Sequence, residues 1–248
     1  MTKHNHLTYA MHDIKKYVKF SQEELKQFLY VLFAGAFVWT FNKWGIVYFD
    51  LERGLANLIL AIIFMGIFFY GQLWIKKYVA VKLGYNTKYE WSMPGLIAMI
   101  VVAFLSYGYI PFILMGHTKL IQEDRKRLGK GHRFAFNHID YFKICMLGYL
   151  FNYAIILIIL APIFLSTNSH FVMMLIKINL ALIFFSILPL PKNDGLALFF
   201  SSRNMYYVIV VFIIIMSLLI LLFHLFGFIL ALIISLIAAR VIFIYLKI

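Results

Sequence analysis

The chain has 248 residues, of which 64% are hydrophobic and only 13% are charged, and its mean hydropathy is +0.89. This composition excludes a water-soluble globular domain, because the apolar surface exceeds what a soluble core can bury. The formal net charge of +13 does not indicate nucleic-acid binding, since no platform of aromatic residues accompanies the basic ones.

Long stretches without a charged residue predict membrane-spanning helices. These stretches are 54–75, 91–116, 144–176 and 204–239. Each exceeds the length of about 20 apolar residues that crosses a hydrocarbon core. The spans are expected to be helical, because unpaired backbone groups are costly in lipid. We therefore expect an all-α integral membrane protein, with a polar cytoplasmic leader over residues 1–24 and one polytopic membrane domain over residues 25–248.

The first two spans have recognisable limits in the sequence. Ser21-Gln22-Glu23-Glu24 has the form of a capping box, in which a serine and a glutamate satisfy free amides at the start of a helix. The first span is therefore expected over about 25–44. The second begins near Gly54 and continues past Ile75 into basic residues.

Two breaks divide the later apolar stretches. Pro162 and the polar group at 166–169 interrupt the third stretch, and a turn near 224–227 interrupts the last one. The helices expected from these breaks cover residues 144–165, 170–188, 204–223 and 227–246.

The stretch 91–116 is predicted to enter the membrane and return on the same side. Lysine and arginine gather before it, at 76–88, and after it, at 119–143. Because cytoplasmic loops collect positive charge, both basic segments are expected on the cytoplasmic side. A break near 106–109, followed by Pro111, would form the turn of this re-entrant element.

The resulting topology is multi-pass in the cell membrane, with about six spans, one re-entrant element and both termini cytoplasmic. It places every Lys and Arg on the cytoplasmic side except Lys43 and Arg53, which lie outside, and Lys177, which lies within a span. This bias accounts for the net charge. The basic segment 119–133 is also a candidate for binding anionic lipid headgroups.

The segment that follows the fifth predicted span carries a recognisable motif. Residues 186–195 read S-I-L-P-L-P-K-N-D-G, and Pro189, Pro191, Asp194 and Gly195 fit the pattern N-x-x-P-x-P-x-x-D-G. The stretch resembles this element of the site-2 protease family of intramembrane zinc metalloproteases, in which the aspartate is the third metal ligand. Ser186 stands where the family usually has asparagine.

Two further stretches occur in the order that the family requires. Residues 147–152, L-G-Y-L-F-N, resemble the family's A-G-P-x-x-N helix and keep its glycine and Asn152. Residues 72–80, Q-L-W-I-K-K-Y-V-A, resemble the H-E-x-x-H-K-F-V-A helix of archaeal members. The resemblance implies a site-2-protease-like core over about residues 54–203.

The metal-binding helix departs from the family at the residues that carry its chemistry. In H-E-x-x-H the two histidines bind zinc and the glutamate activates the metal-bound water. The corresponding positions here are Gln72, Leu73 and Lys76. Glutamine is a poor zinc ligand, leucine cannot act as a base, and a cationic lysine repels the metal. We therefore expect a pseudoprotease without a zinc cofactor, in which Asp194 is a remnant of the ligand set.

The lysine in the place of the second histidine suggests a structural substitute for the metal. If the resemblance holds, Lys76 and Asp194 approach each other, and a salt bridge would join the second span to the segment after the fifth. The alternative is that Lys76 extends to the cytoplasmic interface and Asp194 is solvated in its loop. A separation beyond about 6 Å would count against the bridge.

Three functions follow from these readings. The leading one is a non-catalytic scaffold that binds transmembrane or amphipathic segments of partner proteins, with Asn152, Pro189, Pro191 and Lys177 as candidate binding residues. Lys177 is a candidate because ionisable groups within a membrane are costly to bury, although it could instead extend to the interface. An active intramembrane zinc metallopeptidase and a small transporter or channel remain alternatives. The sequence leaves the partner's identity and the oligomeric state open.

Overall fold

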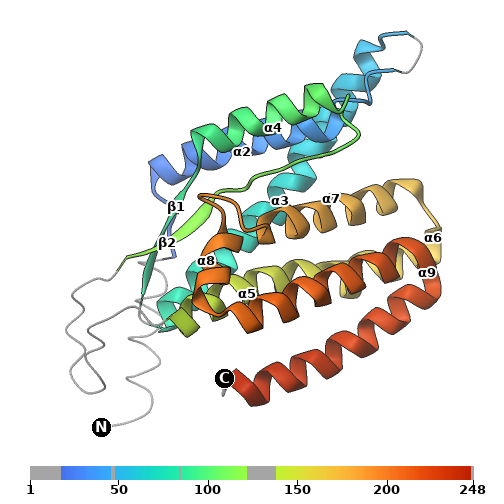
Figure 1. Cartoon of the computed structure of the whole chain (residues 1–248). Coiled ribbons are helices and arrows are strands. Elements are labelled where there is room, and N and C mark those ends of the chain that lie inside the picture. Colours follow the sequence, from blue (N-terminus) through green and yellow to red (C-terminus); the bar gives the residue numbers. More distant parts are fainter. Residues whose placement is uncertain (1–17, 46–47, 84, 122–137, 247–248) are drawn as a thin grey trace.

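The computed structural model of the protein describes residues 18–45, 48–83, 85–121 and 138–246, without the side chains of 222–226, 228–229, 232 and 235–246 (Figure 1). The helical elements are α2 (Gln22–Thr40), α3 (Leu51–Leu83), α4 (Met93–Leu105), α5 (His138–Ala154), the π-helical η1 (Ile155–Leu160), α6 (Ala161–Thr167), α7 (His170–Ile187), α8 (Asp194–Ser201) and α9 (Arg203–Leu246). The strands are β1 (Asn86–Glu90) and β2 (His117–Ile121).

Four helices in the described part of the chain are long and apolar enough to cross a bilayer. They are Leu51–Leu83, His138–Thr167, His170–Ile187 and Arg203–Leu221. The structure is therefore compatible with the predicted all-α membrane protein. The predicted spans at 25–44 and 227–246 stay predictions, because α2 carries three charged residues in its first turns and most side chains beyond Leu221 are not described.

The predicted capping box starts α2 and also anchors it to its neighbours. The Glu24 backbone N–H donates to Ser21 Oγ at 3.2 Å, and the Ser21 N–H donates to Glu24 Oε2 at 2.8 Å. The same carboxylate is buried and accepts hydrogen bonds from Lys77 Nζ and from the backbone N–H of Tyr89, both at 2.8 Å. One glutamate thus joins the start of α2 to α3 and β1.

The segment 91–116 enters the molecule and returns, as the charge pattern predicts. Helix α4 lies beside α2, and after a turn the chain runs back in extended form to β2 (Figure 1). The turn contains Tyr107 and Gly108, with φ of 51° and 72°. Strands β1 and β2 pair antiparallel, from Asn86 opposite Ile121 to Glu90 opposite His117. Both ends of the segment therefore lie at the same end of the molecule.

The two-stranded sheet is an element that the sequence did not predict, added to a structure that is mostly helical. Both strands are short and lie in segments that the sequence marks as charged loops. Their formation depends on pairing between residues about 30 positions apart, which no local pattern reports. The burial pattern of β1 alternates, with Thr87 and Tyr89 facing the interior.

The later helices differ from their predicted limits. The helix expected from residue 144 already begins at His138 and continues to Thr167, passing through η1 just before Pro162. A π-helical turn accommodates the missing N–H of the proline without ending the helix. The stop comes instead at Asn168, which adopts φ 46°. The predicted turn at 224–227 does not divide α9, although Figure 1 shows this helix bending sharply and folding back.

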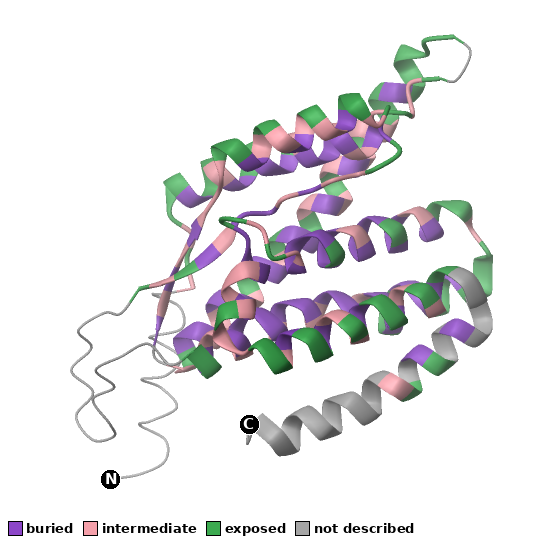
Figure 2. Ribbon diagram, in the orientation of Figure 1, coloured by how far each residue is buried: buried purple, intermediate pink, exposed green. Residues whose placement is uncertain are grey.

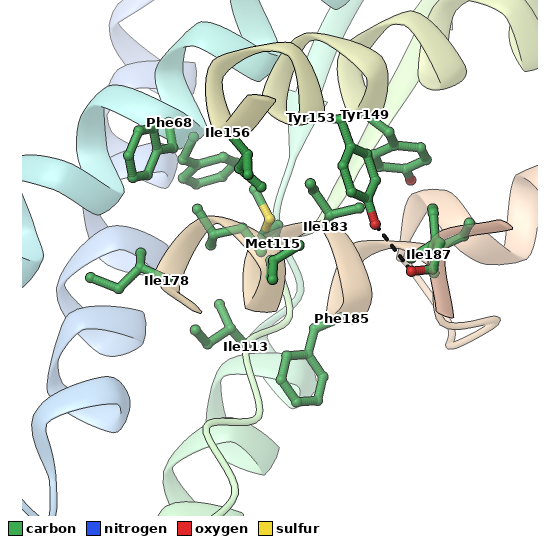
Figure 3. Packing of buried hydrophobic residues seen from close by; sticks show 14 of the residues in the cluster. Phe68, Ile113, Met115, Tyr149, Tyr153, Ile156, Ile178, Ile183, Phe185 and Ile187 are labelled. Atoms are coloured by element: carbon green, nitrogen blue, oxygen red, sulfur yellow. Dashed lines mark hydrogen bonds between the residues drawn. The ribbon is translucent and has the colours of Figure 1, made fainter. Parts of the chain in front are cut away.

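The core lies between α3, α5, α7 and the extended return segment 110–116. Figure 2 shows buried residues on the faces that these elements turn toward one another. Phe68, Ile113, Tyr149 and Ile183 come from these four elements and meet in the cluster of Figure 3. In contrast, the outer face of α3 exposes apolar residues once every turn, as a lipid-facing helix does. They are Ile59, Ile63 and Ile67.

Candidate functional site

A buried ion pair lies where the sequence motifs converge. Lys76 Nζ on α3 is 2.5 Å from Asp194 Oδ2 at the start of α8, and the two side chains are only 2% and 4% exposed. The hypothesis of a salt bridge between them is therefore confirmed. The alternative is wrong for both residues: Asp194 is the first residue of a helix instead of a solvated loop residue, and Lys76 does not extend to an interface.

The second oxygen of the Asp194 carboxylate is also engaged. Asp194 Oδ1 accepts the backbone N–H of Thr118 at 2.8 Å and the hydroxyl of Tyr141 at 3.2 Å. One carboxylate thereby joins α3, β2, α5 and α8. Hydrogen bonds to a charged acceptor are stronger than neutral ones, and each satisfies part of the cost of burying the charge. The arrangement holds together strand β2 at the end of the re-entrant segment 91–116 and the helices α3 and α5, which precede and follow this segment in the chain.

The turn before α8 places Asp194 against the end of α7. Asn193 Nδ2 donates to the carbonyl oxygens of Phe185 and Leu188, at 2.9 and 3.0 Å, and so satisfies free carbonyls at the end of that helix. A Cβ atom at Gly195 would lie 2.1 Å from the carbonyl oxygen of Ile187. Only glycine permits this approach of two backbone segments.

A second glycine makes room for the lysine. A Cβ atom at Gly148 on α5 would lie 2.6 Å from Lys76 Cε and 3.3 Å from Gln72 Cγ. Helix α5 therefore passes directly over the aliphatic part of the lysine side chain. The ammonium group lies 5.2 Å from the ring centroid of Tyr149, one residue further on, within the range of a cation–π contact.

Buried amides continue the polar centre one turn away from Lys76. Asn152 Nδ2 donates to Gln72 Oε1 at 2.9 Å, and Asn179 Nδ2 donates to the carbonyl oxygen of Asn152 at 3.2 Å. All three side chains are fully buried. Gln72 Nε2 and the Oδ1 atoms of Asn152 and Asn179 have no hydrogen-bond partner among the described residues. Leu73, the next residue after Gln72, packs in the apolar core.

The residues of this centre do not fit a zinc ion. Gln72, Lys76 and Asp194 come together, yet they supply a neutral amide, a cation and a carboxylate that the cation already occupies. Within the described ranges no group of three or more His, Cys, Asp or Glu residues could hold a metal ion. Zinc sites in proteins need three or four nitrogen, sulfur or carboxylate ligands.

The adjacent lysine forms a second buried pair that sequence reasoning missed. Lys77 Nζ is 2.8 Å from Glu24 Oε2, with side chains 5% and 4% exposed, and lies 4.5 Å from the ring of Phe20. The two neighbouring lysines thus point in different directions from α3, Lys76 toward α8 and Lys77 toward α2. The capping box identifies Glu24 as a helix start, but its pairing with a residue 53 positions away has no local signal.

The remaining predicted binding residues lie apart from this centre. Pro189 and Pro191 are exposed on the turn before α8, whereas Asn152 is buried among the amides. Lys177 is exposed on α7 and lines a pocket at the far end of the molecule. Of the predicted headgroup-binding segment 119–133, only 119–121 is described.

The centre therefore consists of an ion pair and amides that join helices, and it brings together residues from all three motif stretches. Gln72 and Lys76 come from the first stretch, Asn152 from the second and Asp194 from the third. Comparison with known proteins gave no matching family model, no matching curated protein and no matching solved structure.

Proposed function

We propose that this protein is a non-catalytic relative of the site-2 proteases, which holds transmembrane or amphipathic segments of partner proteins without cutting them. The observation that carries the proposal is the ammonium group of Lys76, which lies 2.5 Å from the carboxylate of Asp194. In the family this carboxylate would bind the metal. Here a covalently attached cation occupies it.

The chemistry of the pair supports a structural role. A metal ion can polarise a carbonyl and lower the pKa of a bound water, which is how zinc proteases generate their nucleophile. An ammonium paired with a carboxylate has no open coordination position for a water. The neighbouring Gln72 and Leu73 supply neither a base nor a further anionic ligand. The pair joins α3 to α8, as a metal ion bound by residues of both helices would.

The return segment 110–116 supports the binding part of the proposal. It lies between α4 and α7, with Leu114 Cδ1 3.3 Å from the Cβ position of Gly95 and Phe112 5.5 Å from Phe185. Ile113 and Leu114 form no backbone hydrogen bond with any described residue. Unpaired backbone groups are costly at membrane depth. Because Ile113 is buried, a partner segment is expected to pack against the open start of the return segment, where Ile110 is 52% exposed.

A crosslinking experiment tests the binding. A photoreactive amino acid replaces Ile110, which is 52% exposed on the return segment, and in a matched variant it replaces Ile59, which is 49% exposed on the lipid-facing side of α3. After irradiation in native membranes, the Ile110 variant is expected to give adducts with membrane segments of uncleaved proteins, and the Ile59 variant to give lipid adducts. Mass spectrometry identifies the attached peptides. Lipid adducts alone at both positions would refute the scaffold.

A further inference from the structure

Basic residues from three separate elements line one pocket at the end of the molecule away from the sheet. The pocket has a volume of about 720 Å³ and lies between the end of α2, the start of α3, the turn after α4 and the first half of α7. Its basic lining residues are Lys43, Arg53, His170 and Lys177. Three of these are the Lys and Arg residues that the predicted topology leaves outside the cytoplasmic loops. The predicted excess of Lys and Arg in the cytoplasmic loops therefore does not account for the basic residues of this pocket.

These cations have no counter-ion in the described structure. No Asp or Glu lines the pocket, and none of the four basic side chains forms an ion pair between described residues. The carboxylate of Asp50 instead accepts the backbone N–H of Arg53 at 3.0 Å. Burial lowers the pKa of Lys43, and the charge of Lys177 lowers it further. Lys43 and Lys177 line the same pocket, and an anion bound between them would relieve the repulsion of their charges.

Other groups of the pocket can donate hydrogen bonds to the same anion. Trp39 lines the pocket, and its buried Nε1 has no hydrogen-bond partner among the described residues. Lys43 Nζ lies 4.8 Å from the ring of this tryptophan. A guanidinium, two ammonium groups and an indole N–H exceed what a single carboxylate needs, but they match the three or four oxygens of a phosphate.

The rim of the pocket indicates its depth in the membrane. Aromatic side chains at this end of the molecule are strongly exposed. They are Tyr48, Phe49, Tyr107 and Tyr109. Exposed aromatic residues gather where a protein passes through the headgroup region of a bilayer. These aromatic residues favour a position of the pocket at the level of the lipid phosphates.

We propose that this pocket binds a phosphate oxyanion through Lys43, Arg53 and Lys177, supplied either by the headgroup of an anionic phospholipid or by a soluble phosphate. The site does not depend on the proposed scaffold function. Arg53 and Lys76 are separated by about 35 Å along α3, at a rise of about 1.5 Å per residue, so each site can be disrupted without the other.

Thermal unfolding of the full chain tests the proposal with two probes. One is inorganic phosphate added to the protein in detergent, and the other is phosphatidylglycerol in phosphatidylcholine nanodiscs, compared with phosphatidylcholine alone. A ligand that binds only the folded state raises the unfolding midpoint. The double variant Lys43→Gln/Lys177→Gln is expected to bind the stabilising probe at least about tenfold more weakly, because it removes two charge-assisted hydrogen bonds to the anion.

Two further variants keep the result interpretable. Lys26→Gln removes an exposed cation at the opposite end of α2 and is expected to leave the stabilisation unchanged, while Lys177→Arg retains it. Stabilisation by phosphatidylglycerol alone identifies a headgroup site, and stabilisation by inorganic phosphate as well identifies a site for soluble phosphate. If neither probe stabilises the protein, or if Lys26→Gln reduces the effect as much as the double variant, the proposal is overturned.

Discussion

Replacing Lys76 by methionine is expected to lower the free energy of unfolding by about 3–5 kcal/mol, because it leaves the buried carboxylate of Asp194 without its cation. Methionine keeps the length of the aliphatic chain beneath Gly148, so packing changes little. Unfolding followed in detergent, by thermal or denaturant titration, measures the change. Lys82→Met, on the exposed last turn of the same helix, serves as the matched control and should change stability by no more than about 1 kcal/mol.

The double variant Lys76→Met/Asp194→Asn separates the ion pair from the loss of one side chain. Asparagine can still accept the N–H of Thr118 and the hydroxyl of Tyr141. Because no unpaired charge is then buried, the double variant should be more stable than Lys76→Met alone, with a coupling energy of at least about 2 kcal/mol. If the loss of stability in the double variant equals the sum of the losses in Lys76→Met and Asp194→Asn, the two residues do not interact.

Gly195→Ala is expected to have an effect of similar size through a different cause. The new Cβ would lie 2.1 Å from the carbonyl oxygen of Ile187 and 2.3 Å from that of Leu188, and both atoms belong to the backbone. The turn must open to relieve this contact, which is expected to cost about 3 kcal/mol and to move Asp194 away from Lys76. The yield of folded protein and its unfolding midpoint report the loss.

Gly66→Ala on α3 is the matched control for this substitution. Its Cβ would meet only the side chain of Leu32, with Cδ2 at 3.4 Å and Cδ1 at 3.8 Å, and alanine favours the helix over glycine by about 1 kcal/mol. This variant should be as stable as the parent protein or more so. A Gly195→Ala variant that unfolds at the same temperature as Gly66→Ala would show that the turn before α8 is not tightly constrained.

The hydrophobic spans and the re-entrant segment could be predicted because their signals are local. Length and apolarity identify α3 and α7, and the basic residues on both sides of 91–116 predict that this segment turns back, which agrees with the pairing of β1 and β2 at its ends. The sheet that closes this segment could not be predicted. Its strands are short and charged, and each is stable only against the other.

The candidate site was predictable only through the resemblance of three motif stretches. Hydropathy carries no information that Lys76 and Asp194 meet, since they lie 118 residues apart. The motif order supplied this long-range relation. No motif in the sequence predicts the pair between Lys77 and Glu24, and none predicts the cationic pocket. Both features are formed by residues that are far apart in the sequence, so only the folded structure reveals them.

Zinc content is the measurement that tests the central claim most directly. The protein is purified, incubated with excess zinc, freed of unbound ion and analysed for metal by mass spectrometry, alongside the Lys76→Met variant. Because the ammonium of Lys76 holds the carboxylate of Asp194, the protein is expected to retain far less than one zinc per chain. One tightly held zinc per chain, removed by a chelator with loss of stability, would contradict the account.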